Sequence, residues 1–138
     1  MSIIHVILSG GVGSRLWPLS TKERPKQYLP LFDDKTLFSH TVERNRPFFF
    51  LVIVVGNTDN YQLSREALEV IGLTDYTEIV EAAPRNTAAA IAFAAFSVAP
   101  EAVLLVTPSD HIISNEKAYS NAFKSAFQWA KNDYLVTF

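Results

Sequence analysis

Strand-like apolar runs alternate along this chain with segments whose apolar residues recur at helical spacing. The strand-like runs occupy residues 3–8, 51–55, 77–81, 102–106 and 134–138. Between them, apolar side chains recur at intervals of three or four residues, which predicts helices over 36–46, 59–71, 86–98 and 116–131. Three of these segments are followed by residues of types that end helices, which are Pro47, Gly72 and Pro100.

The alternation of strands and helices indicates an α/β fold. Apolar strands separated by helices form a mostly parallel sheet with helices on both faces. The final run, residues 134–138, has no helix after it, whereas a parallel strand normally leads into a crossover that covers the sheet. We therefore expect a domain truncated after its fifth strand, with an open sheet edge that could promote association into a homo-oligomer.

The predicted sheet also indicates where a ligand would bind. In parallel sheets, ligands lie beyond the carboxyl ends of the strands. The segments that follow the first four predicted strands read GGVGSR, GNTDN, EAAPRNT and TPSDH. Because these segments are rich in Gly, Asn, Arg, Ser, Thr, Asp and His, we expect them to form one rim that carries the chemistry.

Composition narrows the class of protein. The chain has 138 residues, 49% of them hydrophobic, which is enough for one ordinary globular domain. A net charge of −2 argues against general binding of nucleic acid. The chain has no cysteine for disulfides or thiolate metal sites, and its start lacks the pattern of a signal peptide. No apolar run reaches the roughly 20 residues of a membrane helix, so we expect a cytoplasmic protein with no membrane partner.

The first rim segment has the composition of a phosphate-binding turn. The first predicted strand stops at Ser9, and Gly10, Gly11 and Gly13 follow. A glycine turn after a strand can direct backbone N–H groups at a phosphate, and the guanidinium of Arg15 can donate two hydrogen bonds to its oxygens. The alternative is a tight turn that only ends the strand, because a lone glycine cluster is a weak signal.

A basic segment follows this turn. Four cations and one anion lie between residues 12 and 32, a local net charge of +3 in an otherwise acidic chain. Lys26 stands in the sequence PKQYL, where Pro25 restricts the backbone and Leu29 and Leu31 can anchor the segment to the core. Lys26 is therefore the cation that we expect to be held toward a ligand. Two further cations are interpreted as parts of a solvated loop, and these are Lys22 and Arg24.

Residues Trp17, Pro18 and Leu19 lie between the glycine turn and the basic segment. We expect them to pack the loop against the fold, since Trp carries one of the largest apolar surfaces of any side chain. Stacking of an exposed Trp17 on a nucleobase is the alternative.

The third rim segment opens a predicted helix with Arg85, Asn86 and Thr87. Asn86 or Thr87 can cap this helix, and the free N–H groups at its start can meet an anion or the acceptor atoms of a base. Small side chains at 88–90 would let a ligand approach closely. A capped core helix with no ligand is an equally good interpretation of this segment.

The fourth rim segment contains Ser109, Asp110 and His111. Asp110 comes just after a predicted buried strand, where a carboxylate suits Mg²⁺ that bridges phosphates. The alternative is a carboxylate that caps a turn or a helix. His111 is expected to be a hydrogen-bonding scaffold, and His5 and His40 are expected to be structural.

Four stretches of the sequence together resemble one family. ILSGGVGSRLWPLS, ERPKQYL, PRNTAAAIAFAA and LLVTPSDHII occur in this order. In this the chain is similar to the bacterial mannose-1-phosphate guanylyltransferases, including the form fused to phosphomannose isomerase. The pattern GGxGxRLxP is shared by sugar-1-phosphate nucleotidyltransferases in general. The Trp in RLWPLS, the PKQYL form and the RNTAxAIA block point to the GDP-mannose branch.

The resemblance implies a Rossmann-like, GT-A-like nucleotidyltransferase fold of three layers. It covers essentially the whole chain but only the N-terminal part of that family's catalytic domain. Residues 1–138 would then be the nucleotide-binding part of a longer domain. The segments with which the family binds the sugar phosphate have no counterpart here, so we expect the chain to be poorly active alone.

The family's chemistry is implied in the same way. Mannose 1-phosphate attacks the α-phosphorus of GTP, which gives GDP-mannose for polysaccharide biosynthesis and releases pyrophosphate. The predicted catalytic residues are Arg15, on the β- and γ-phosphates, and Lys26, on the transferred phosphoryl group. Asp110 would bind Mg²⁺. The predicted nucleotide-binding residues are Ser9, Gly10, Gly11, Gly13, Arg85, Asn86, Thr87 and Ser109.

The sequence departs from the family pattern in the block that would line the base. Pro84 and Ala89 stand where the family usually has Gly and Pro. Two alternatives to guanylyl transfer stay open. One is a nucleotidyltransferase that uses UTP or dTTP for another sugar 1-phosphate, and the other is a non-catalytic protein or interaction module that keeps the fold.

Overall fold

The computed structural model describes residues 2–11, 13–83 and 86–138. The strands are β1 (Ile3–Leu8), β2 (Leu51–Asn57), β3 (Thr77–Glu81) and β4 (Val103–Pro108). The helices are α1 (Leu37–Asn45), α2 (Tyr61–Val70), α3 (Asn86–Phe96) and α4 (Glu116–Ala130). Two short 3-10 helices lie between β1 and α1, at Ser14–Leu16 and Lys26–Tyr28. These eight main elements confirm the first eight predicted from the hydrophobic pattern, with ends that differ by at most two residues.

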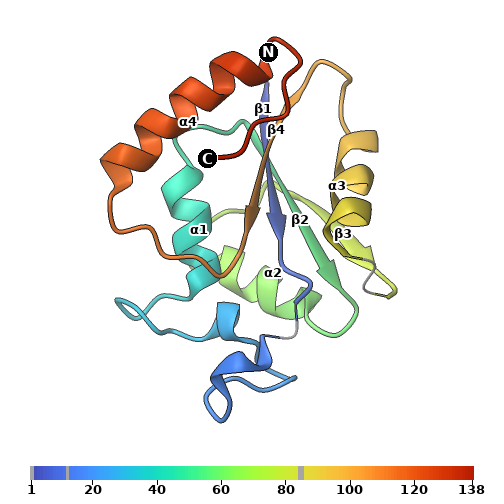
Figure 1. Ribbon diagram of the computed structural model, residues 1–138. Helices are drawn as coiled ribbons and strands as arrows, with labels where there is room; N and C mark the ends of the chain where they lie inside the picture. The colour runs from blue at the N-terminus through green and yellow to red at the C-terminus, as the bar shows by residue number, and fades with distance from the viewer. Residues whose placement is uncertain (1, 12, 84–85) are drawn as a thin grey trace.

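The four strands form one parallel sheet in the order β3-β2-β1-β4. Figure 1 shows β1 (blue) between β2 and β4, with the strands ending at the same edge. The chain adds β2 and β3 on one side of β1 and then crosses back to place β4 on the other side. The space beyond the carboxyl ends of β1 and β4 is therefore the switch point at which sheets of this type bind ligands.

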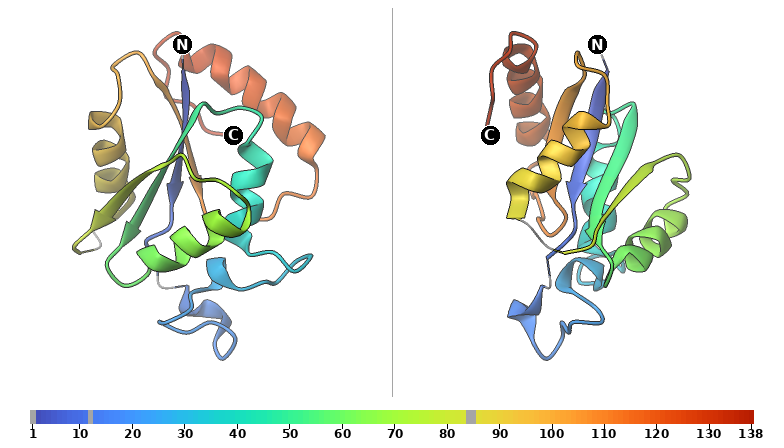
Figure 2. Two further views of the ribbon diagram at one scale, coloured as in Figure 1. Left: turned by 180° about the vertical axis from the view of Figure 1, so that it is seen from behind. Right: turned by 90° about the vertical axis from the view of Figure 1, so that its right-hand side faces the viewer.

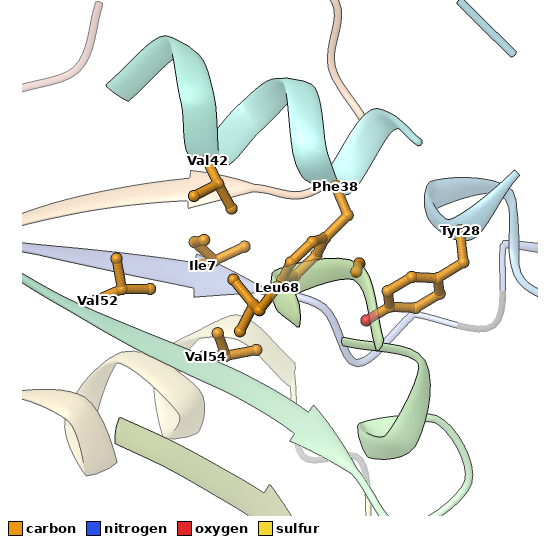
Figure 3. Packing of buried hydrophobic residues seen from close by; sticks show 8 residues of the cluster. Ile7, Tyr28, Phe38, Val42, Val52, Val54 and Leu68 are labelled. Carbon is orange, nitrogen blue, oxygen red and sulfur yellow. The ribbon is translucent and has the colours of Figure 1, made fainter. Parts of the chain in front are cut away.

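Two apolar clusters hold the helices to opposite faces of the sheet. On one face, side chains from β1 and β2 pack against α1, α2 and Tyr28, as Figure 3 shows for Ile7, Tyr28, Phe38, Val42, Val52, Val54 and Leu68. On the other face, the alternate residues of the same strands pack against α3, and they are Ile4, Val6, Ile53 and Val55 with Ala90 and Ala94. The second view of Figure 2 shows α2 and α3 on opposite sides of the sheet. The predicted arrangement of helices on both faces is confirmed.

Helix α4 lies beside α1 near β4 (Figure 1). The hydroxyl of Tyr119 in α4 donates a hydrogen bond of 2.6 Å to Oδ1 of Asn45 in α1. The ring of Phe123 in α4 stacks on Phe48, which follows α1, with 4.2 Å between the ring centroids. Among the helices of the described residues, none is long and apolar enough to cross a membrane.

The prediction of a fifth strand at 134–138 is wrong. Residues 134–138 are not part of the sheet and instead fold back along α4 (Figure 1). The ring of Phe138 lies 5.7 Å from that of Tyr119 and 6.4 Å from that of Phe123, both in α4. Tyr134 contacts the indole of Trp129 edge-on, with 5.4 Å between ring centroids. A short apolar segment can form a strand or can pack against aromatic rings, and its sequence does not distinguish the two. Here the aromatic contacts with α4 fix the position of residues 134–138.

The prediction that Trp17, Pro18 and Leu19 pack against the fold is also wrong. The side chain of Trp17 is 76% exposed and that of Leu19 is 67% exposed. The turn is held instead by Ser20, which is buried and whose Oγ accepts a hydrogen bond of 3.2 Å from the backbone N–H of Leu16. A polar side chain that binds the backbone thus anchors this segment, and its apolar side chains are left in solvent.

Candidate active site

Two adjoining hollows lie at the carboxyl edge of the sheet. The first has a volume of about 390 Å³ and is lined by Leu8, Gly11, Gly13, Arg15, Lys26, Gln27, Ser109 and Asp110. The second has a volume of about 260 Å³ and is lined by Leu8, Gly10, Gly11, Val55, Glu81, Asn86, Thr87 and Ala90. They share Leu8 and Gly11, so they meet at the glycine loop, by which we mean residues 9–11 and 13. The segments after β1, β3 and β4 therefore form one rim, whereas the segment after β2, which was expected there as well, lines neither hollow.

The first hollow contains an ion pair between two elements that are far apart in sequence. Nζ of Lys26 lies 2.6 Å from Oδ2 of Asp110, and the two side chains are 23% and 25% exposed. Nε2 of His111, whose side chain is mostly exposed, lies 3.7 Å from the other carboxylate oxygen. Arg15 lines the same hollow. Two cations and one carboxylate thus face the first hollow.

The backbone of Lys26 is anchored by the residues that follow it. Lys26 begins the 3-10 helix Lys26–Tyr28, in which Gln27 is 3% exposed and Tyr28 is 2% exposed. The predicted anchors were Leu29 and Leu31, but Leu31 is 37% exposed and Leu29 is only partly buried. The segment is therefore held by a buried amide and a buried ring, which sequence hydrophobicity alone did not indicate.

Gly13 makes close contact with this 3-10 helix. Its φ angle is +56°, in the left-handed region that favours glycine. A Cβ atom at this position would lie 2.7 Å from the backbone nitrogen of Lys26 and 2.9 Å from Oε1 of Gln27. The glycine loop and Lys26 can approach one another only because residue 13 has no side chain.

Ser9 lies beneath the glycine loop. It is 1% exposed, it lines neither hollow, and its hydroxyl is hydrogen-bonded to the hydroxyl of Tyr28. Burial raises the pKa of Tyr28 to about 12, so this phenol stays protonated to a higher pH than an exposed one. Ser9 was predicted to bind nucleotide, but its side chain is directed into the protein.

The second hollow contains a carboxylate that the sequence interpretation missed. Glu81 is the last residue of β3, and its Oε1 atom is buried without a hydrogen-bond partner among the described residues. A Cβ atom on Gly10 would lie 3.7 Å from Oε2 of Glu81, so the carboxylate reaches the glycine loop. The rule that ligands bind beyond strand ends could have identified it, because Glu81 opens the third rim segment.

Asn86 and Thr87 line the second hollow at the start of α3. Asn86 is the first residue of the helix and has a φ angle of +68°, a conformation that Asn tolerates better than most residues. Arg85, the other predicted residue of this block, and Pro84 before it lie outside the described residues.

The remaining candidates of the sequence interpretation lie away from the hollows. His5 is fully buried, and its Nε2 is hydrogen-bonded to Oγ1 of Thr107 at 2.9 Å. Burial, together with the positive charge of Arg44, lowers the pKa of His5 to about 3, so it is neutral and structural as predicted. Nε2 of His40 donates a hydrogen bond of 2.9 Å to the carbonyl of Phe32. Two cations of the basic segment are exposed as predicted, namely Lys22 and Arg24.

The donor set at Asp110 limits the kind of metal site that it could form. The described residues contain no group of three or more His, Cys, Asp or Glu side chains that could hold a metal ion. Mg²⁺ usually binds to one or two carboxylates and completes its shell with phosphate oxygens and waters. A single carboxylate beside two cations in a hollow fits that arrangement, in which the metal is shared with a phosphate ligand.

Comparison with known proteins identifies relatives of the chain among nucleotidyltransferases. Residues 4–138 match the family described as nucleotidyl transferase. The chain is 39% identical over 140 residues to the alginate biosynthesis protein AlgA of Pseudomonas aeruginosa, an alignment that covers 99% of this chain and 29% of that protein. It is 40% identical over 142 residues to a mannose-1-phosphate guanylyltransferase of Sinorhizobium fredii, covering 99% of this chain and 28% of that protein.

A solved structure is similar to this chain in fold and in sequence. The crystal structure of mannose-6-phosphate isomerase from Helicobacter pylori has a TM-score of 0.81 and 34% identity, and the match covers 96% of this chain and 47% of that chain. The chain spans less than a third of the length of the two curated relatives named above.

Proposed function

This chain belongs to the nucleotidyl transferase family, and we propose that it binds GTP and Mg²⁺ as the nucleotide-binding part of a mannose-1-phosphate guanylyltransferase. In the proposed reaction, a phosphate oxygen of mannose 1-phosphate forms a bond to the α-phosphorus of GTP. The bond from that phosphorus to the oxygen shared with the β-phosphate breaks. The products are GDP-mannose and pyrophosphate, and the shared oxygen leaves with the pyrophosphate.

The observation that carries this proposal is the meeting of two unlike hollows at the glycine loop. One is lined by Arg15 and Lys26, and the other by the polar side chains of Glu81 and Asn86. A nucleoside triphosphate has the matching form, an anionic chain at one end and a base with hydrogen-bonding edges at the other. The backbone of the glycine loop, which belongs to both hollows, would lie where the two parts of the ligand join.

The cations supply the charge that phosphoryl transfer needs. Arg15 can donate two parallel hydrogen bonds to the oxygens of the departing pyrophosphate. Lys26 carries a compact positive charge on a segment that its buried neighbours anchor. It can therefore stabilise the negative charge that develops on the oxygens of the transferred phosphoryl group. Neither residue forms a covalent bond, and their contribution is positioning and charge stabilisation.

Asp110 is the residue that would hold Mg²⁺. The chemistry that a bound Mg²⁺ would supply here is neutralisation of the negative charge on the triphosphate. The carboxylate is paired with Lys26 at 2.6 Å in the free protein. A triphosphate would offer Lys26 a new anionic partner, which would release the carboxylate of Asp110.

Glu81 favours guanine over the other bases. Guanine presents two neighbouring donors, N1–H and the amino group on C2, and a carboxylate can accept from both. Uracil and thymine present one N–H donor on their pairing edge, so they would leave part of the carboxylate unpaired. The carboxylate of Glu81, which lines the second hollow, therefore supports GTP against the UTP and dTTP alternatives.

The test is a nucleotide panel followed by an activity assay. The chain is titrated with GTP, UTP, dTTP and ATP in the presence of Mg²⁺, and binding is measured by calorimetry and thermal shift. We expect the tightest binding for GTP, and equal affinities for all four would contradict the guanine assignment. Release of pyrophosphate that requires both GTP and mannose 1-phosphate supports guanylyl transfer. Because the chain is expected to be poorly active alone, little or no release would agree with the proposal, whereas failure to bind any of the four nucleotides would support the non-catalytic alternative.

A further inference from the structure

Three side-chain amides hold three consecutive carbonyl groups of the glycine loop. One amide comes from the last residue of β2, one from the turn before α2, and the third from the 3-10 helix Lys26–Tyr28. The bonds run from Nδ2 of Asn60 to the carbonyl of Ser9 (2.9 Å), from Nδ2 of Asn57 to that of Gly10 (2.8 Å), and from Nε2 of Gln27 to that of Gly11 (3.0 Å). Nε2 of Gln27 also lies 3.4 Å from the carbonyl oxygen of Ser9.

These bonds fix which way the backbone N–H groups point. In a planar trans peptide, the carbonyl and the following N–H point in opposite directions. Holding the carbonyls of Ser9 and Gly10 toward the asparagines therefore directs the N–H groups of Gly10 and Gly11 the other way. Both glycines line the hollows, so their N–H groups are offered to a ligand there. A carbonyl turned to the same place would repel a phosphate.

The two asparagines are themselves held in a single orientation. Oδ1 of Asn57 accepts hydrogen bonds from the backbone N–H groups of Asp59 (3.0 Å) and Asn60 (3.1 Å). Oδ1 of Asn60 accepts one from the backbone N–H of Asn57 (3.2 Å). Because the oxygens are occupied in this way, the amide NH₂ groups must face the glycine loop. Asn57 and Asn60 are 5% and 3% exposed, and neither lines a hollow.

We propose that Asn57 and Asn60 are positioning residues for the phosphates of the bound nucleotide. They act through the glycine loop, whose N–H groups they hold toward the phosphate chain, and they do not touch the ligand. The segment GNTDN was expected to face the ligand as part of the rim, and its two asparagines instead support the loop from behind. This inference rests on the proposed function, since it assigns phosphates to the hollow beside Gly11.

Replacement of either Asn by Asp tests the proposal with little change of shape. The new carboxylate keeps the acceptor oxygen for the backbone N–H groups of the turn. It replaces the donor that faces the loop with a negative oxygen, which repels the carbonyl of Gly10 or Ser9. The loop can relieve this repulsion by turning its peptide groups, and its N–H groups then lose their direction.

Asn45 provides a matched control. It is also fully buried, with Nδ2 donating 2.9 Å to the carbonyl of Thr41 and Oδ1 accepting from Tyr119. Asn45→Asp makes the same chemical change in the core, away from the glycine loop. Binding of GTP and of guanosine to the unaltered chain, Asn57→Asp, Asn60→Asp and Asn45→Asp is measured by calorimetry with Mg²⁺ present.

We expect the two loop variants to bind GTP about tenfold or more weakly, because hydrogen bonds to a charged phosphate are lost. Their affinity for guanosine, which has no phosphate, should stay at the wild-type value. Asn45→Asp should leave both affinities unchanged. If the Asp variants do not unfold cooperatively, Asn57→Ala and Asn60→Ala take their place, with a smaller loss for GTP in the same direction.

Wild-type affinity for GTP in folded loop variants would overturn the proposal. An equal loss for GTP and guanosine would also overturn it, because it would indicate general damage to the site. Failure of the unaltered chain to bind GTP is a different result, which would remove the proposed function and this inference together.

Discussion

Lys26 and Asp110 join the segment after β1 to the end of β4, with 2.6 Å between Nζ and Oδ2. In the free protein each charge neutralises the other. A triphosphate gives Lys26 a stronger set of partners and leaves Asp110 available to a metal. Nucleotide and Mg²⁺ are therefore expected to strengthen each other's binding, and by linkage the strengthening factor is the same in both directions.

Asp110→Asn should abolish this coupling. The amide keeps the size of the side chain but loses the charge that attracts a divalent cation. We expect the affinity of the wild-type chain for GTP to rise with Mg²⁺ and that of Asp110→Asn to be independent of it, as measured by calorimetry at several metal concentrations. Asp75→Asn, an exposed position before β3, serves as the control. If GTP binding still depends on Mg²⁺ in Asp110→Asn, a residue other than Asp110 binds the metal.

Arg15→Ala should weaken the binding of GTP by roughly 1.5–3 kcal/mol, the usual contribution of hydrogen bonds to charged groups. Arg15 lines the first hollow, whereas Lys22 is an exposed cation of the same segment that lines neither hollow. Lys22→Ala is therefore the control for a general loss of positive charge. Equal effects of the two substitutions would show that only the overall charge of the segment matters. If Arg15→Ala binds GTP with unchanged affinity, Arg15 does not contact the triphosphate.

Glu81→Gln should reduce discrimination between bases. The amide can still accept one hydrogen bond from guanine, but its NH₂ group opposes the second donor, so GTP should lose roughly tenfold in affinity relative to UTP. Competition titrations of the two nucleotides against the variant measure this ratio. Glu69→Gln, an exposed position in α2, removes the same charge far from the base. If the GTP to UTP ratio stays at its wild-type value in Glu81→Gln, another residue selects the base.

Gly13→Ala should disturb the glycine loop and the position of Lys26 together. A Cβ atom there would lie 2.7 Å from the backbone nitrogen of Lys26, at a φ angle of +56°. Gly72 has a similar φ of +69° but nothing within 4 Å of its Cβ position, so Gly72→Ala isolates the cost of the backbone conformation. That cost is about 1–2 kcal/mol. We expect chemical denaturation to show a larger loss for Gly13→Ala, and only this variant to bind GTP more weakly. Equal losses would mean that the loop moves away from Lys26 freely.

Local patterns predicted the elements of this fold because each strand and helix depends on residues close in sequence. The runs at 3–8 and 77–81 match β1 and β3 residue for residue. The run at 134–138 failed because its alternative, packing of Phe138 on Phe123, depends on a partner 15 residues away. Exposure of Trp17 depends in the same way on surfaces that only the folded chain defines.

The candidate site was predicted in part for a similar reason. Asp110 could be found from the rule for parallel sheets, and Lys26 from the basic segment that follows the glycine turn, and the structure brings these two together. What the rule does not indicate is which polar side chain faces the ligand. Asn57 belongs to a rim segment and Ser9 directly precedes one, yet both are buried, and their polar atoms bind the protein.

His5 should make the protein less stable in acid. Its pKa is lowered from 6.5 to about 3 by burial first and by the charge of Arg44 second. Between these two pH values the unfolded chain binds a proton at His5 and the folded chain does not, so the free energy of unfolding falls as pH falls through this window. From pH 7 to pH 5 this single group should lower the free energy of unfolding by about 2 kcal/mol.

His5→Gln keeps a polar partner for Thr107 but cannot take up the proton. We expect urea denaturation at the two pH values to show a drop that is smaller in His5→Gln than in the wild type by about that amount. Identical drops would mean that His5 is protonated in the folded protein at a pKa near its ordinary value.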